Sequence, residues 1–339
     1  MTLHVTIEGR LPPDLPALVE SVTFGTAGLR YRRLGAAVQI ARLNDPTFVV
    51  ARRDGLLVGA CVLDRRALLL DGKPTIGIYR GLLCVAPSAL GQGIGRRLAA
   101  AARAGIETLA RDTDSPLLSW GCIDADNHAS LSLLVSEGAR DVGGLAMFMT
   151  YRQWPRERVR LHALADSREP READALSASQ GDCLVRDITP SRLPGLALVD
   201  DHGLRVSARV AVSGYRIESM GPALDALVRR GVLPFAPARR RFDPSAFRYV
   251  RFSDVTLRAG DEGAWSAFVS GVLARHAAHF GMTFVDPTSA LHARLRRVGP
   301  FGRLVHGTDA PIRLMMRQAG KSTQPFDTAG PLSLAPVDG

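Results

Sequence analysis

Three closely spaced glycines at the start of a predicted helix are the residues of this sequence with the clearest chemical meaning. They are Gly91, Gly93 and Gly95. An apolar, strand-like run ends at Val85, and the spacing of apolar residues predicts a helix from Arg96 to about Arg111. Glycines allow close approach to the backbone, and the free N–H groups of a helix's first turn point at an anion. The pattern predicts a phosphate-binding loop.

Two arginines that follow the glycines strengthen this interpretation. Arg96 and Arg97 stand in the first turn of the predicted helix, where a positive charge opposes the helix dipole. Two cations are unfavourable at this position unless an anion lies among them. The sequence therefore places an anionic ligand here.

Two common nucleotide-binding patterns do not fit this part of the chain. A dinucleotide-binding loop needs a third glycine where Arg96 stands. A P-loop needs Gly-Lys-Ser/Thr after a fixed gap. The one Gly-Lys-Ser, at 320–322, has Met315 in place of the first glycine.

The loop resembles the pyrophosphate-binding loop of the GNAT superfamily of acyl-coenzyme A N-acyltransferases, whose pattern is Arg/Gln-x-x-Gly-x-Gly/Ala. Gly93 and Gly95 match that pattern, and Val85 and Pro87 match the strand end and the proline before it. Leu90 departs from it, because arginine or glutamine is usual there. The departure removes one side-chain contact and leaves the backbone cradle intact. The alternative is a glycine-rich turn in another α/β protein.

A second stretch resembles the family's Asn-x-x-Ala-x-x-Leu-Tyr-Glu-Lys-x-Gly-Phe helix. The matching residues are Asn127, Ala129 (one place early), Leu133 and Gly138. Leu134 and Ala139 stand at the tyrosine and phenylalanine positions. Together the two motifs cover residues 46–151. Because the family's proton-donating tyrosine is missing, a module that binds acyl-coenzyme A without turnover stays open as an alternative.

The resemblance implies an α+β GNAT fold, a mixed and mostly antiparallel twisted sheet flanked by helices. The second half repeats the order strand, glycine loop, helix, strand, helix, strand, so it resembles a degenerate second GNAT domain. Its loop carries Asp261 and Glu262, whose charges would repel a pyrophosphate. The predicted divisions are a GNAT domain (1–152), a linker (153–180), a degenerate GNAT-like domain (181–320) and a disordered tail (321–339). The predicted closing strands are 145–151 and 312–316.

The resemblance also assigns the residues that would bind the donor. The strand end would hold the pantetheine arm through Leu83, Cys84 and Val85, with a backbone N–H at or beside Val85 polarising the thioester carbonyl. Asn127 would contact the arm near the point where two strands separate. The pyrophosphate would lie against Gly91, Gln92, Gly93, Ile94, Gly95 and Arg96.

The general base is less obvious, since many family members use a glutamate on the strand before the loop and residues 78–82 contain no carboxylate. Asp124, at the end of the next predicted strand, is the first candidate. Asp126, His128 and Tyr79 follow it. The ordinary alternative is that the two aspartates serve as turn or cap residues. A thiol with a pKa near about 8.5 can depart without much proton assistance, so loss of the tyrosine does not forbid turnover.

Composition limits the class of protein. The 339 residues suit two domains, and 46% are hydrophobic, which is enough for a real core. The net charge is +10, and nearly all of the positive charge is arginine. No basic run with interleaved aromatics appears, which argues against a nucleic-acid partner. A basic surface would help to recruit polyanionic coenzyme A.

Cysteine spacing and hydropathy exclude further classes. Cys61, Cys84, Cys122 and Cys183 are far apart and lack Cys-x-x-Cys spacing, so neither a zinc site nor a disulfide scaffold is expected. We expect no metal. No signal-peptide core and no run of about 18 apolar residues occurs, so we expect a cytoplasmic protein without membrane contact.

The sequence thus favours an acetyl-coenzyme A-dependent N-acetyltransferase, with acetyl-coenzyme A as cosubstrate and an amine on a small molecule or peptide as acceptor. One alternative is a binding or scaffolding module without turnover. Another is an acyltransferase with a longer acyl donor. Homo-oligomerisation stays open.

Overall fold

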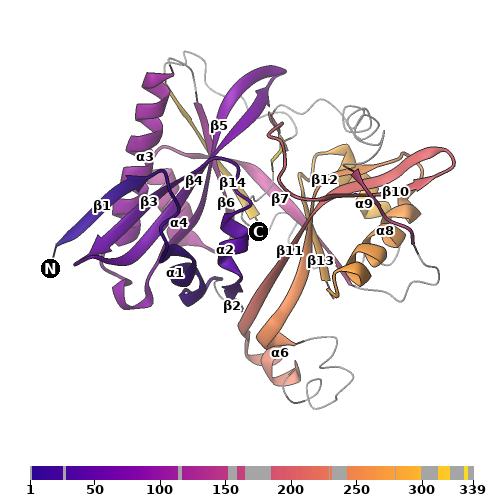
Figure 1. Ribbon diagram of the computed structural model, residues 1–339, viewed down its shortest axis with the longest axis horizontal. Coiled ribbons are helices and arrows are strands. Elements are labelled where there is room, and N and C mark those ends of the chain that lie inside the picture. The colour runs from indigo at the N-terminus through magenta and orange to yellow at the C-terminus, as the bar shows by residue number, and fades with distance from the viewer. Residues whose placement is uncertain are drawn as a thin grey trace.

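The computed structural model describes residues 2–25, 28–113, 117–151, 159–164, 185–228, 230, 243–278, 280–298, 312–320 and 332–334. Within these residues one twisted sheet runs through both halves of the molecule (Figure 1). Its strand order is β1-β3-β4-β5-β6-β14-β7-β13-β12-β11-β10-β8. Most neighbouring strands are antiparallel; β5–β6 and β12–β13 are parallel. The predicted mixed, mostly antiparallel fold class is confirmed.

The first half follows the predicted order closely. Its elements are β1 (Leu3–Glu8), α1 (Leu15–Ser21), β2 (Leu29–Leu34), α2 (Ala36–Ile40), β3 (Pro46–Arg53), β4 (Leu56–Leu70), β5 (Lys73–Val85), α3 (Ile94–Asp112), β6 (Leu117–Asp124), α4 (His128–Ser136) and β7 (Arg140–Tyr151). The helix after the glycine loop begins at Ile94, two residues earlier than predicted. Gly95 and Arg96 therefore belong to its first turn.

The second half repeats this arrangement. Its elements are β8 (His162–Ala163), β9 (Val185–Asp187), β10 (Gly195–Asp200), β11 (Gly203–Met220), α6 (Pro222–Leu227), β12 (Phe247–Leu257), α8 (Glu262–Arg275), β13 (Phe280–Val285), α9 (Ala290–Arg297), β14 (Ile312–Ala319) and β15 (Leu332–Ser333). β13 starts at Phe280, four residues after the C-cap of α8 at His276.

Helices cover the sheet on both faces. In the first half α3 packs on one face, and a methyl group added at Gly59 of β4 would lie 3.0 Å from both Ile94 and Leu98. The helices α1 and α2 cover the opposite face through Leu15, Val19 and Ile40. In the second half the apolar side of α8 buries its aromatic side chains on β11 and β12. The close approach at Gly59 fixes the start of α3 against the sheet.

The last strand of each half pairs with the other half. β14 lies between β6 and β7, and β7 in turn pairs with β13. The strand predicted to close the first domain (145–151) thus pairs with strands of the second half. The strand predicted to close the second domain (312–316) pairs with β6 and β7 of the first half. Figure 1 shows the yellow β14 beside β6 on the left and β7 crossing to the right.

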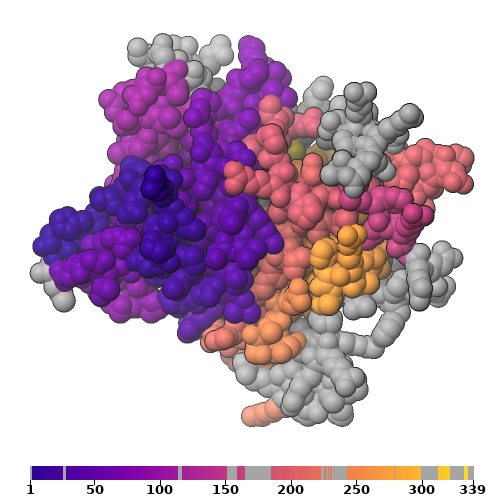
Figure 2. Space-filling model, in the orientation of Figure 1, coloured from indigo at the N-terminus to yellow at the C-terminus, as the bar shows by residue number. Residues whose placement is uncertain are grey.

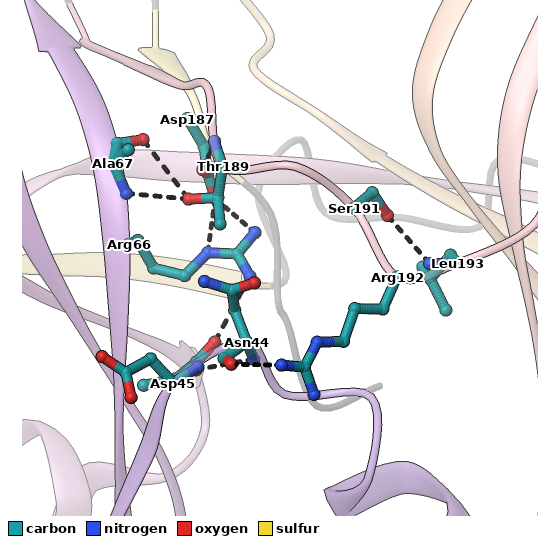
Figure 3. Close-up of polar contacts among 10 residues, drawn as sticks. Asn44, Asp45, Arg66, Ala67, Asp187, Thr189, Ser191, Arg192 and Leu193 are labelled. Atoms are coloured by element: carbon teal, nitrogen blue, oxygen red, sulfur yellow. Dashed lines mark hydrogen bonds and ion pairs between the residues drawn. The ribbon is translucent and has the colours of Figure 1, made fainter.

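Further contacts tie the halves together. β2 pairs with β11, and β9 pairs with β4. At this junction Arg66 of β4 donates to Asp187 at 2.8 and 3.0 Å, and Arg192 donates to the carbonyl of Asn44 at 2.8 Å (Figure 3). Figure 2 shows the indigo-to-purple first half in direct contact with the salmon and orange second half. The two halves therefore share one continuous framework.

Two predicted segments are described only in part. Within the predicted linker, residues 159–164 pack on α8, and β8 pairs with β10. Within the predicted tail, Leu332 and Leu334 are buried, and Leu332 pairs with Val185. These few residues differ from the expected linker and disordered tail because their apolar side chains find core contacts. The remainder of both segments lies outside the described residues.

The sequence predicts neither a membrane-spanning helix nor a metal site, and both can be examined in the described part of the chain. Among those residues, no helix is long and apolar enough to cross a membrane. They also include no group of three or more His, Cys, Asp or Glu side chains placed to hold a metal ion.

Candidate functional site

The strands β5 and β6 separate part-way along their length. Their parallel pairing runs from Ile76 opposite Leu117 to Tyr79 opposite Trp120 and then stops. β5 continues to Val85 and β6 to Asp124 without pairing to each other. We call this opening, between residues 80–85 and 121–124, the first fork. Within the described residues, β5 and β6 are therefore not paired with each other over these stretches.

A β-bulge re-aims β5 inside the first fork. Leu82 has a φ of +51°, and the register of β5 on β4 shifts by one residue there. Beyond the bulge, the N–H of Ala86 donates to the carbonyl of Val58 on β4 at 2.9 Å. Because strand residues alternate in direction, the N–H and C=O of Val85 and Leu83 point away from β4, toward the fork. The backbone of Cys84 faces β4 instead.

The two cysteines at the fork differ in environment. The Cys84 thiol is buried, and burial raises its pKa to about 12. Cys122, on β6 inside the fork, is half-buried. Since the thiolate is the reacting species, Cys84 is not a nucleophile. The reactivity of the Cys122 thiol can instead be used to measure access to the fork.

This difference predicts a labelling pattern. At pH 8 we expect a maleimide to modify Cys122 and to leave Cys84 unmodified until the protein is unfolded, because roughly one Cys84 thiol in 10⁴ is ionised there. Saturating acetyl-coenzyme A should slow modification of Cys122. Peptide mapping by mass spectrometry measures both sites. Rapid modification of native Cys84, or no protection of Cys122, would contradict the geometry.

The glycine loop leaves open space at the start of α3. Gly91 and Gly93 have φ values of +74° and +72°, and a methyl group added at Gly91, Gly93 or Gly95 would meet no atom within 4 Å. Gly93 is the N-cap and supplies no side-chain cap. The first backbone bond of the helix joins the N–H of Arg97 to the carbonyl of Gly93.

The N–H groups of Ile94, Gly95 and Arg96 therefore precede the helical bonds and point outward. The side chains beside them divide into two kinds. Arg96 and Arg97 are exposed, whereas Ile94 is buried and contributes only its backbone. The Gln92 side chain donates to the carbonyl of Ser88 at 3.2 Å, which holds the loop. The arrangement is an anion cradle at the end of the strand that lines the fork.

The predicted polar residues gather at the outer end of β6. Asn127 Oδ1 accepts the N–H of Ser130 at 3.1 Å and caps α4. Asp124 Oδ1 accepts the N–H of Asp126 at 2.9 Å in an Asx turn. Asp124 and His128 are both exposed. Thus the turn role weighed for Asp124 is present, and the Asp124 carboxylate remains accessible.

Tyr79 lies elsewhere, at the closed end of the fork. Its side chain is 2% exposed and packs on Trp120, with ring centroids 5.8 Å apart. The structure therefore brings Asp124, His128 and Asn127 together at the open end and separates Tyr79 from them.

A buried ion pair beside the fork was not anticipated. Arg80 Nη1 of β5 lies 2.8 Å from Glu137 Oε2 at the end of α4, and both side chains are less than one-tenth exposed. The neighbouring Gly121 of β6 also packs closely. A methyl group added there would lie 3.3 Å from the Arg80 carbonyl oxygen and 3.7 Å from the Leu134 side chain of α4. The pair links one arm of the fork to α4. Its members are far apart in sequence, so local pattern gave no signal.

The second half has a comparable fork. The β12–β13 pairing stops at Phe252 opposite Thr283, and Asp254 sits in a bulge with a φ of +49°. After β13, Asp286 accepts the N–H of Thr288 at 2.7 Å and Ser289 caps α9, as Asp124 and Asn127 do in the first half. The two halves are repeats of one supersecondary plan.

The second loop lacks the anion cradle. Asp261 is the N-cap of α8 and accepts Arg205 Nε and Nη2 at 2.5 and 2.7 Å. The hydrogen bond from Arg205 lowers the Asp261 pKa, so the carboxylate stays charged. Glu262 follows in the first turn. The protein's own carboxylates thus occupy the start of α8.

Sequence comparison decides the family. Residues 20–136 match the Acetyltransferase (GNAT) family model. These residues are a GNAT acyltransferase domain. The match spans the fork, the glycine loop of the GNAT domain and the capped helix α4. No curated protein matches the sequence at a significant level.

Solved structures extend the comparison beyond the GNAT domain. N-myristoyltransferase from Saccharomyces cerevisiae with bound myristoyl-CoA is similar over 94% of this chain and 82% of its own, with 10% identity and a TM-score of 0.57. A tandem GNAT protein from the clavulanic acid biosynthesis pathway covers 94% and 100%, with 15% identity and a TM-score of 0.49. A GCN5-related N-acetyltransferase from Anabaena variabilis covers 93% and 72%, with 11% identity and a TM-score of 0.47. The first of these likenesses shows a shared fold across both halves.

Proposed function

We propose that the GNAT domain binds acetyl-coenzyme A and transfers the acetyl group to an amine. The observation that carries the proposal is the placement of two open features on one strand. β5 ends in a fork with outward-facing backbone groups, and it leads directly into an uncapped helix N-terminus bordered by Arg96 and Arg97. An acyl-coenzyme A matches both features, because its pantetheine arm carries the thioester at one end and the pyrophosphate at the other.

The donor would lie along this path. Its pyrophosphate would accept the N–H groups of Gly93, Ile94, Gly95 and Arg96, with Gly91 and Gln92 shaping the loop. Its pantetheine arm would enter the first fork and pair with the backbone of Leu83 and Val85. Cys84 would support the strand from behind, and Asn127 would border the arm at the outer end of β6.

The chemistry requires attack by a neutral amine on the thioester carbonyl, formation of an oxyanion and departure of the coenzyme A thiolate. The Val85 N–H points into the fork, where it can donate to the developing oxyanion. One such donor typically contributes about 10²–10³-fold to turnover. The thiolate departs with little proton assistance, since its conjugate acid has a pKa near about 8.5.

Asp124 is the first candidate to take the proton from the attacking amine, with His128 beside it. One carboxylate oxygen of Asp124 holds the Asx turn, and the described residues donate no hydrogen bond to the other. The exposed position keeps the carboxylate within reach of solvent. Tyr79 is the weakest of the three candidates, because it is buried at the closed end of the fork.

Asp124→Asn tests this assignment. We expect acetyl transfer to fall by at least about a hundredfold with donor affinity unchanged, because a positioned base contributes about 10²–10⁴-fold and asparagine can still accept the Asp126 N–H. Thiol release at saturating donor measures the effect.

A matched control is available on β7. Asp141 accepts the N–H of Gly143 in a similar turn at 3.0 Å, so Asp141→Asn should leave turnover near wild type. Full activity of Asp124→Asn would exclude Asp124 as the general base, and His128 would then be tested in the same way.

Calorimetry with the full chain tests the donor. We expect acetyl-coenzyme A and coenzyme A to bind with micromolar dissociation constants and a stoichiometry of one, whereas NAD should not bind. Only one site is expected because Asp261 and Glu262 occupy the start of α8. A second site that Gly260→Ala weakens would contradict this expectation.

Two alternatives are outcomes of the same experiments. Tight donor binding with no thiol release across amines, amino acids and peptides would favour a binding module, for which the missing tyrosine at Leu134 is a natural reason. Tighter binding and faster transfer with myristoyl-coenzyme A than with acetyl-coenzyme A would favour a longer donor, as in the yeast N-myristoyltransferase structure.

A further inference from the structure

The buried ion pair of Arg80 and Glu137 lies where the backbone pairing of β5 and β6 ends. Tyr79 and Trp120 are the last residues of the two strands that pair with each other. Arg80 and Gly121 come next, and they begin the two arms of the first fork. The arms are still close at this point, since a methyl group added at Gly121 would lie 3.3 Å from the Arg80 carbonyl oxygen. The ion pair therefore stands at the base of the fork.

The helix α4 connects the two arms. Its Leu134 belongs to an apolar cluster with Ile123 of β6 and Met315 of β14. Glu137, the C-cap of the same helix, holds Arg80 of β5 at 2.8 Å. One side of α4 is thus packed on the β6 arm by apolar contacts, while its end is tied to the β5 arm by charge. The ion pair links the two arms at the point where backbone hydrogen bonds no longer do so.

Stability alone does not require charges at this position. An apolar pair of similar volume often replaces a buried ion pair without loss. Among the described residues, the buried Arg80 Nε has no hydrogen-bond partner, and an unsatisfied donor costs further free energy. Apolar contacts are non-directional, whereas a charged contact between a guanidinium and a carboxylate fixes their distance and orientation. These properties favour a role of the pair in geometry.

Two groups of the proposed reaction lie on the parts that the ion pair connects. Val85, whose N–H points into the fork, ends the same strand that carries Arg80. Asp124 ends β6, directly before the turn into α4. A change in the separation of the arms would therefore move Asp124 relative to the Val85 N–H. A misplacement of about 1 Å can lower turnover by about a hundredfold.

We propose that Arg80 and Glu137 form a positioning pair for the donor site. The pair holds the two arms of the first fork at the separation that admits the pantetheine arm, and it keeps Asp124 in place relative to the Val85 N–H. This inference rests on the proposed acetyl transfer. The competing explanation is a pair that contributes only to the stability of the fold.

The double variant Arg80→Met/Glu137→Leu separates the two explanations, because it can restore packing without restoring a charged contact. Cys122 is half-buried inside the fork, so its modification by a maleimide measures the separation of the arms. With no donor present, we expect Cys122 to react severalfold faster in the variant than in the wild type. Cys84 is the internal control, since it is buried and should stay unmodified as long as the protein is folded.

Donor binding and turnover give two further measurements. In the double variant, the dissociation constant for acetyl-coenzyme A should rise by at least about tenfold. Thiol release at saturating donor should fall by about a hundredfold. A pair that only stabilises the fold would change none of the three measurements in a folded variant.

Arg52→Met/Asp14→Leu is the matched control. It removes an ion pair with hydrogen bonds of 2.8 and 3.2 Å between β3 and the N-cap of α1, and this pair does not join the arms of the fork. Cys122 modification, donor affinity and turnover should all stay near wild type.

Glu137→Gln replaces the double variant if the latter loses its thermal transition, because glutamine keeps the size of the side chain and removes its charge. Unchanged Cys122 modification, or unchanged donor affinity, in a folded variant overturns the proposal. Cys122 modification needs neither donor nor acceptor. A wild-type protein that binds acetyl-coenzyme A but releases no thiol would therefore contradict the proposed transfer and not this role of the pair.

Discussion

Replacing Gly95 by glutamate is expected to abolish donor binding while the fold becomes slightly more stable. Gly95 is in the first turn of α3, and a methyl group added there would meet no atom within 4 Å. Glutamate is a better helix former than glycine by about 0.5–1 kcal/mol and suits a helix N-terminus. The same carboxylate would occupy the anion cradle and repel a pyrophosphate.

Calorimetry should show the dissociation constant for acetyl-coenzyme A rising by at least about a thousandfold, equal to about 4 kcal/mol. Ala100→Glu is the matched control, because Ala100 is an exposed position further along the same helix. That variant should keep donor affinity within a few fold. Retained affinity in a folded Gly95→Glu protein would exclude the loop as the donor site.

The second large effect is expected at the buried ion pair of Arg80 and Glu137. Arg80→Met should lower the free energy of unfolding by about 3–5 kcal/mol, because it leaves a buried carboxylate without its partner. Since Arg80 belongs to the arm of the first fork, the same variant should weaken donor binding. Urea denaturation and calorimetry measure the two effects.

A double variant separates loss of the charge from loss of packing. Arg80→Met combined with Glu137→Leu should recover most of the lost stability, because a well-packed apolar pair often replaces a buried ion pair without loss. Arg313→Met breaks a half-exposed pair with Asp141 and should cost less than about 1 kcal/mol. A similar loss in both single variants would contradict the burial argument.

Local features were readable from the sequence. The glycine loop, the helix that follows it and the motif that begins at Asn127 each depend on residues within a few positions of one another. The Asx turn at Asp124 was also among the interpretations that local spacing supported. The start of α3 was placed two residues late, because Gly95 weakens a helix signal even where it lies inside the helix.

Other features depend on contacts between distant segments. The bulge at Leu82 has no local signature, and the register of β4 and β5 alone reveals it. Arg80 and Glu137 are separated along the chain by α3, β6 and α4. Phe252 lies opposite Thr283 because β12 and β13 pair in parallel. Sequence spacing could not place any of these residues side by side.

The sequence by itself determined the kind of site, a phosphate cradle in a GNAT-like repeat, because backbone freedom at glycine and the charge of arginine act over one helical turn. It also indicated that the second loop carries Asp261 and Glu262. Only the tertiary structure decided that Arg205 pairs with Asp261, that β7 and β14 each pair across the two halves, and that β5 and β6 separate beyond Tyr79 and Trp120. These outcomes follow from strand register and packing, which sum many weak long-range contacts that no short stretch of sequence encodes.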